Sequence, residues 1–262
     1  MTSQRLFKLF ALIAALLAVG FAGQPTASAQ NFRVESKVYE GSAKEPSVKT
    51  LTLFNGDVIY DILNGNDEVT VYDVKRGSFD VLCPAKKVRT KIDAETAGTL
   101  VEALRHRADA QKSSFLRFMA NPNFEEKFDA ESGRMTLDGP FITYEVQCAK
   151  YNQETADSYK YFTDWSAMIN TLLNAGSRLP YARMNLNSAL AKKSLLPKEV
   201  NLTLRTTKNI FARPLTARSE HVLTVGLTVE DRKRIESIGR DLTNFKEVDW
   251  NEYRKQTSRS EE

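Results

Sequence analysis

Residue types that commonly perform catalysis are sparse in this sequence of 262 residues. It has two histidines, His106 and His221, and a catalytic histidine needs a nucleophile and an orienting acid close to it in space. His106 lies between two arginines, which indicates a solvated helix face. His221 follows Glu220 at the start of a predicted strand and could form half of an acid–base pair. Because the sequence carries no nucleophile-elbow, zinc-protease or phosphate-loop motif, a hydrolase is only our third hypothesis.

Four clustered acidic residues could in principle bind a metal or cleave a glycosidic bond. Strand alternation places Glu125 and Asp129 on one face, with Glu126 on the other and Glu131 in a turn. Catalytic carboxylates would instead have to face each other across a cleft. We therefore interpret the cluster as a hairpin with a hydrated face, and expect no catalytic residue, metal ion or cofactor.

Two cysteines, Cys83 and Cys148, lie in strand-like runs, Ser78–Cys83 and Phe141–Ala149. Their separation fits neither a redox motif nor a zinc site. In an oxidising compartment we expect a disulfide between them. It would close a loop of about 65 residues and contribute about 4 kcal/mol in the chain-entropy model. Two free buried thiols are the alternative.

One segment is strongly basic although the chain as a whole is nearly balanced in charge. From Arg178 to Arg218 the only acidic residue is Glu199, and the net charge is +8. Such a segment can attract anionic headgroups, polyanions or an acidic partner, whereas the alternative is a basic face paired with acids elsewhere in the fold. We expect no nucleic-acid partner, because no aromatic–basic RNA motif is present. Its basic residues are Arg178, Arg183, Lys192, Lys193, Lys198, Arg205, Lys208, Arg213 and Arg218.

The first part of the chain has the pattern of short antiparallel strands. Apolar and polar residues alternate from Phe32 to Val38, and Asn55-Gly56 between two apolar runs is a strong hairpin signal. Strands are then predicted at Glu68–Val74, Ser78–Cys83 and Val88–Ile92.

The spacing of the apolar residues then changes from every second residue to every third or fourth residue. Asp93 can cap a helix that runs to about Ala108, and a second helix is predicted from Thr155 to Asn174. Further strands and shorter helices follow, the helices at Asn187–Lys193 and Glu230–Leu242. This order predicts an α+β fold with a curved, mostly antiparallel sheet that bends around apolar helices.

Four segments carry a family resemblance: Thr52–Tyr60 (TLFNGDVIY), Val71–Lys75 (VYDVK), Val88–Ile92 and Leu196–Leu204 (LPKEVNLTL). In this pattern the chain resembles the lipoprotein-localisation-factor family, and also uncharacterised exported bacterial proteins. The first resemblance implies an unclosed half-barrel whose concave face is covered by helices. It also implies a lipid or lipoprotein acyl chain as ligand.

The first 29 residues read as a secretory signal peptide. Arg5 and Lys8 precede the apolar run Leu9–Phe21, and Ala27-Ser28-Ala29 has the small residues that precede cleavage. The alternative is an uncleaved membrane anchor. The apolar run is shorter than the ~20 residues that a membrane span needs, which favours the signal peptide. We therefore expect a periplasmic or extracellular protein. It would comprise a single domain over residues 30–245 and a loosely held polar tail over residues 246–262.

Two functional hypotheses follow from these patterns. In the first, the chain is a non-enzymatic envelope protein that binds an apolar or amphipathic ligand in its concavity. The aromatic-rich second helix would form one wall, with an ordinary packed core as the alternative. In the second, the chain is an interaction or scaffold module that docks its basic segment on an anionic membrane surface. The wall residues of the first hypothesis are Tyr161, Phe162, Trp165, Met168 and Ile169.

Overall fold

The computed structural model describes residues 31–65, 67–174, 177–206 and 213–257, so the predicted signal peptide lies outside the described residues. The fold is α+β, with a curved sheet of twelve strands that does not close and six helices in the described part of the chain. Every strand pair is antiparallel except β12 with β6. The predicted fold class is therefore confirmed.

The first six strands form the predicted meander, in which each strand pairs with the next. Asn55 pairs with Val58 across the predicted turn, where Gly56 adopts a φ of +62° that favours glycine. The strands are β1 (Phe32–Glu40), β2 (Val48–Asn55), β3 (Val58–Leu63), β4 (Glu68–Asp73), β5 (Ser78–Cys83) and β6 (Val88–Asp93).

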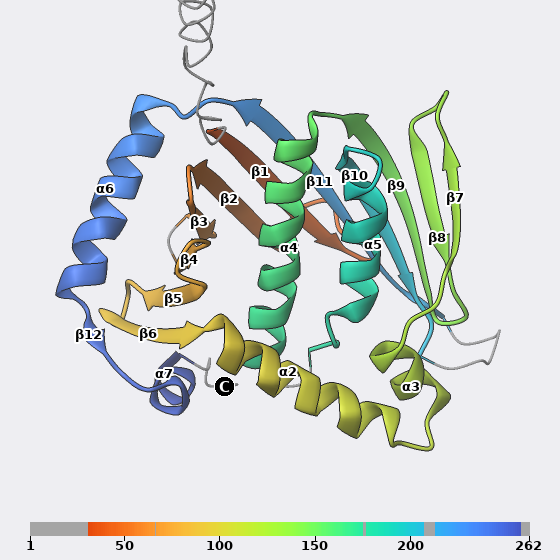
Figure 1. The fold of residues 1–262 in the computed structure, drawn as a ribbon, viewed down its shortest axis with the longest axis horizontal. Coiled ribbons are helices and arrows are strands. Elements are labelled where there is room, and N and C mark those ends of the chain that lie inside the picture. The colour runs from red at the N-terminus through yellow and green to blue at the C-terminus, as the bar shows by residue number, and fades with distance from the viewer. Residues whose placement is uncertain (1–30, 66, 175–176, 207–212, 258–262) are drawn as a thin grey trace, which may run out of the picture.

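Of the other six strands, five extend the sheet beyond β1, and the short strand β12 pairs with β6 at the opposite edge. Strand β11 pairs with β1 and so joins the two halves, as Figure 1 shows. The order across the sheet is β12-β6-β5-β4-β3-β2-β1-β11-β10-β9-β8-β7. These strands are β7 (Glu125–Asp129), β8 (Arg134–Asp138), β9 (Ile142–Lys150), β10 (Leu195–Leu204), β11 (Leu215–Val225) and β12 (Lys246–Glu247).

Most of the helices cover the concave face of the sheet. Helices α4 (Gln153–Leu173) and α5 (Tyr181–Ala191) lie across this face, and α2 (Ala94–Asp109) and α3 (Ser114–Ala120) run along one end of it (Figure 1). Asp93 caps α2 as predicted, accepting a hydrogen bond of 2.8 Å from the Thr96 backbone N–H. None of the described helices is both long and apolar enough to cross a membrane.

The apolar core has two parts on the concave face. In the larger part, aromatic side chains from β1, β2, β4 and β5 pack around Phe162 of α4. In the smaller part, β8, β9 and β10 pack against α3 and α5. The concave face is thus already filled with side chains along much of α4.

A third apolar cluster lies on the convex face, under helix α6 (Val229–Asn244). Leu53 of β2 and Leu82 of β5 are fully buried there, although the neighbouring residue Phe54 is buried on the concave face. Arg33 of β1 ties the start of α6 to the sheet through ion-pair distances of 3.0 and 3.1 Å to the Asp231 carboxylate. The sheet is therefore covered on both faces over β2–β5.

Residues 246–257 are packed, where the sequence predicted a loose polar tail. The Val248 N–H donates to the Arg89 carbonyl at 2.9 Å, and helix α7 (Trp250–Thr257) follows. Tyr253 has no exposed surface and belongs to the main core. A few spaced apolar residues attach this charged segment to the core. The average polarity of the segment does not reveal this attachment.

The predicted disulfide is not formed, because Cys83 and Cys148 are both free thiols. Six strands separate β5 from β9 in the sheet, which is roughly 30 Å along the sheet at the usual strand spacing. A disulfide needs Cα atoms within about 7 Å of each other. Burial raises the pKa of the Cys148 thiol to about 11.

Candidate functional site

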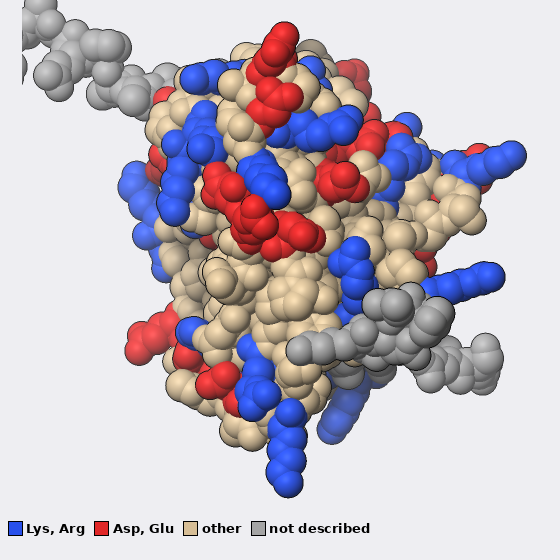
Figure 2. Space-filling view, turned by 90° about the vertical axis from the view of Figure 1, so that its right-hand side faces the viewer, with Lys and Arg blue, Asp and Glu red and all other residues tan. Residues whose placement is uncertain are grey.

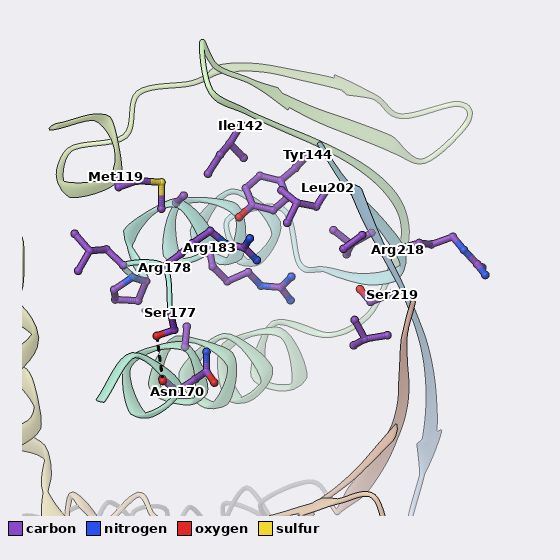
Figure 3. Close-up of a pocket in the computed structure, with 17 residues that line it drawn as sticks. Met119, Ile142, Tyr144, Asn170, Ser177, Arg178, Arg183, Leu202, Arg218 and Ser219 are labelled. Carbon is purple, nitrogen blue, oxygen red and sulfur yellow. Dashed lines mark hydrogen bonds between the residues drawn. The ribbon is translucent and has the colours of Figure 1, made fainter. Parts of the chain in front are cut away.

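A cavity of about 490 Å³ lies between α4, α5 and the concave surface of the sheet (Figure 3). Strands β1, β9, β10 and β11 form its wall on the sheet side, and Ala167 and Asn170 face it from α4. Part of its lining is apolar, including Met119, Ile142 and Leu202. Its principal polar groups are Tyr144, Arg178, Arg183 and Ser219.

Two arginines turn their guanidinium groups into this cavity, as Figure 3 shows for Arg178 and Arg183. Neither forms an ion pair with any described residue. Arg183 is partly buried and Arg178 is exposed at the cavity. Two cations that face one space without a carboxylate partner favour an anionic partner, because a guanidinium forms strong charge-assisted hydrogen bonds with carboxylates and phosphates.

A chain of hydrogen bonds holds Arg183 in position. Its Nε donates to Oδ1 of the buried Asn187 at 3.0 Å, and Nδ2 of Asn187 donates to the Asp164 carboxylate at 2.7 Å. That carboxylate is itself neutralised by the Lys160 ammonium at 2.6 Å. The positive charge of Arg183 therefore remains available to the cavity.

Tyr144 adds a hydroxyl to the same space. Burial raises the pKa of Tyr144, and the nearby charges of Arg183 and Arg178 act in the opposite direction. Its hydroxyl points towards Arg183 in Figure 3. Two guanidinium groups and a phenol hydroxyl can together bind a carboxylate or phosphate group.

His221 lies on the concave face of β11 between two serine hydroxyls. Its Nδ1 is 2.9 Å from the Ser36 Oγ, and its Nε2 is 2.9 Å from the Ser219 Oγ. Burial, with a smaller effect from Arg183, lowers the pKa of His221 to about 3. A neutral imidazole with so low a pKa is a weak general base, which weighs against activation of either serine as a nucleophile.

His221 does not form an acid–base pair with the preceding residue, Glu220. Adjacent strand residues point to opposite faces, and the Glu220 carboxylate accepts hydrogen bonds from Arg218 and Tyr39 on the convex side. His106, the other histidine, is exposed on α2, where its Nε2 lies 3.4 Å from the Glu102 carboxylate.

The acidic cluster lies on the exposed β7–β8 hairpin. The Glu125 carboxylate lies 2.8 Å from the Lys127 ammonium, and the Asp129 carboxylate accepts a hydrogen bond of 2.6 Å from the Ser132 hydroxyl in the turn. Glu126 and Glu131 are also exposed. Figure 2 views the molecule from this side and shows acidic and basic side chains sharing the surface. No group of three or more potential metal ligands occurs among the residues that the structure describes.

The five residues predicted as a ligand wall lie in or against the packed core. The Phe162 ring meets Phe54 and Tyr72 edge-on at centroid distances of 5.7 and 5.5 Å. Trp165 packs on Phe79 at 4.6 Å. Ile169 is buried, and Tyr161 and Met168 are partly buried against the same cluster. None of the five lines the cavity, which meets α4 through a different side of the helix.

The residues of the basic segment occupy different surfaces in the structure. Arg178 and Arg183 face the cavity, whereas Lys192, Lys193, Lys198 and Arg205 are exposed elsewhere. Lys193 lies 3.5 Å from the Glu126 carboxylate, Arg205 donates to the Thr143 hydroxyl at 3.0 Å, and Arg218 pairs with Glu220. Lys208 lies outside the described residues.

Sequence reasoning missed the neutral members of the site. Tyr144 continues the alternation of β9 and looks like a core residue, and Asn187 looks like an ordinary helix residue. Only the shortage of acidic residues around Arg178 and Arg183 carried a signal.

Comparison with known proteins adds no assignment. No family model matches this chain, and no curated protein sequence matches it significantly.

Proposed function

We propose that this chain is an exported, non-enzymatic binding protein for an amphipathic ligand that carries an anionic group. The observation that supports this function best is the pair Arg178 and Arg183. Both face a partly apolar cavity, and neither has a carboxylate partner among the described residues.

The two kinds of lining match the two parts of such a ligand. The anionic group would bind the two guanidinium groups and the Tyr144 hydroxyl through charge-assisted hydrogen bonds. The apolar part would lie against Ile142 and Leu202. The cavity volume of about 490 Å³ is within the usual range for small-molecule sites.

The sequence supports an envelope location and a lipid-like ligand. Residues 1–29 have the pattern of a signal peptide, and the resemblance to lipoprotein-localisation factors suggests an acyl chain. A fatty acid or a lipid with an anionic headgroup combines these features.

Calorimetric titration with palmitate tests the proposal. Arg178→Gln and Arg183→Gln should each weaken binding about tenfold, because each removes hydrogen bonds made by a charged donor. Lys198→Gln and Arg205→Gln remove the same charge from exposed positions of the same segment. These controls should bind palmitate like the wild type.

The docking hypothesis predicts the reverse pattern. Vesicles rich in phosphatidylglycerol would then bind the chain, salt would weaken that binding, and the two exposed-site variants would reduce it. If this pattern is observed and palmitate does not bind at micromolar concentration, the cavity proposal is wrong.

A further inference from the structure

A second cavity, of about 710 Å³, lies between α2, α7, the end of β6 and the C-terminal end of α4. Figure 1 shows α7 beside the start of α2 at this end of the fold. Ser177 and Leu179 line both cavities, which are therefore neighbours along the segment that leads into α5.

The lining of this second cavity is apolar at its base. Ile92 and Leu172 are buried, and Leu104 and Trp250 are partly buried against the main core. Leu100 is 42% exposed, which places it among the few large apolar side chains that the described structure leaves open to water. An apolar ligand that covered Leu100 and Trp250 would remove this surface from water.

Three cations line the same cavity: Lys91, Arg107 and Arg254. No ion pair with a described residue neutralises any of the three side chains. The single acid in the lining is Asp93, whose two oxygens accept hydrogen bonds from the Thr96 N–H and hydroxyl at 2.8 and 2.7 Å. The cavity thus combines an apolar base with a net positive charge.

We infer that this second cavity binds a small apolar anion, namely a medium-chain alkyl carboxylate. The alkyl chain lies against Leu100, Leu104 and Trp250, and the carboxylate binds Arg107 and Arg254. This site is separate from the cavity of the proposed function and does not depend on it.

Indole signals of the ¹⁵N-labelled full-length protein test the inference, with dodecanoate as the probe. The chain has two tryptophans. Trp250 lines the cavity, whereas Trp165 packs on Phe79 in the core and serves as an internal reference. Trp250→Phe identifies the two signals. We expect dodecanoate to shift the Trp250 signal saturably at micromolar concentration and to leave the Trp165 signal in place.

Charge variants separate this site from other binding. Arg107→Gln and Arg254→Gln should each raise the dissociation constant about fivefold, the effect expected for a partly exposed ion pair. Ala103, exposed at the cavity on α2, can be changed without disturbing the core. Ala103→Glu should weaken binding at least about tenfold and Ala103→Lys should not weaken it. Arg240→Gln on α6 and Arg183→Gln should have no effect.

Several results would overturn the inference. One is an unchanged Trp250 signal at millimolar dodecanoate. Another is an equal shift with dodecanol, which has the chain but not the charge. A third is equal affinity of the Glu and Lys variants at position 103. A Trp250 shift that only anionic vesicles produce would assign this face to a membrane surface instead.

Discussion

Asp61 provides the sharpest test of the interior electrostatics. It lies on the concave side of β3, where its carboxylate accepts a hydrogen bond of 2.8 Å from the Thr52 hydroxyl. No cation pairs with it among the described residues. Burial raises the pKa of Asp61 from 3.8 to about 6, and the hydrogen bond from Thr52 offsets only part of this effect.

The raised pKa means that ionised Asp61 destabilises the folded chain. Between pH 4 and pH 6 the folded chain keeps a proton that the unfolded chain releases, so the free energy of unfolding falls as the pH rises. At 1.36 kcal/mol per pH unit, the difference between 3.8 and about 6 corresponds to up to about 3 kcal/mol at neutral pH. Asp61→Asn removes this charge and keeps an oxygen that can accept from Thr52.

Urea denaturation of both proteins between pH 4 and pH 8 measures this contribution. The Asn variant should be more stable by up to about 3 kcal/mol at pH 7, and the advantage should vanish towards pH 4. Asp57→Asn, at the exposed β2–β3 turn, is the matched control and should change stability by less than about 0.5 kcal/mol. An Asp61→Asn advantage that is absent at pH 7, or equally large at pH 4, would refute the reasoning.

Three further predictions concern other parts of the fold. Asp231→Ala should cost about 3 kcal/mol, because it leaves the largely buried Arg33 with only the exposed Glu35 as its partner and removes the carboxylate half of the α6 capping box. Urea denaturation measures this loss, and a loss under about 1 kcal/mol would contradict the prediction. The pKa of His221 is lowered to about 3, so the free energy of unfolding should fall as the pH drops from 6.5 towards 3. In the same assay, the free energy of unfolding of His221→Gln should fall less steeply over this pH range. Unfolded protein without reductant should react as two free thiols, whereas Cys148 should resist the reagent in the folded protein, and a single disulfide by mass would contradict the structure.

Local patterns predicted much of the sheet. The strands β1–β6 follow from alternation and turn residues, because each pairs with its neighbour in sequence. The start of α2 follows from Asp93, whose side chain satisfies the first free N–H groups of the helix. Helix α5 begins six residues before the predicted start, since Pro180 and Tyr181 gave no recognised N-cap signal.

Features that depend on distant pairing were not predictable. Alternation identifies Cys83 and Cys148 as strand residues but does not give the order of strands that separates them. The charge pattern pointed to Arg178 and Arg183 but also to exposed lysines, because net charge does not show which face a side chain occupies. The packing of Tyr253 depends on the same long-range geometry.

The pairing of β1 with β11, the seam of the sheet, affects how the chain folds as it is synthesised. Phe32 pairs with Val225, so β1 is synthesised long before its second partner exists. At roughly 5–20 residues per second, the delay is about 10–40 s. During that interval one edge of β1 offers unpaired N–H and C=O groups, which are a template for wrong pairing with other chains. We expect closure of this seam to be a late and slow step in folding, because it joins the two most widely separated parts of the sheet in sequence.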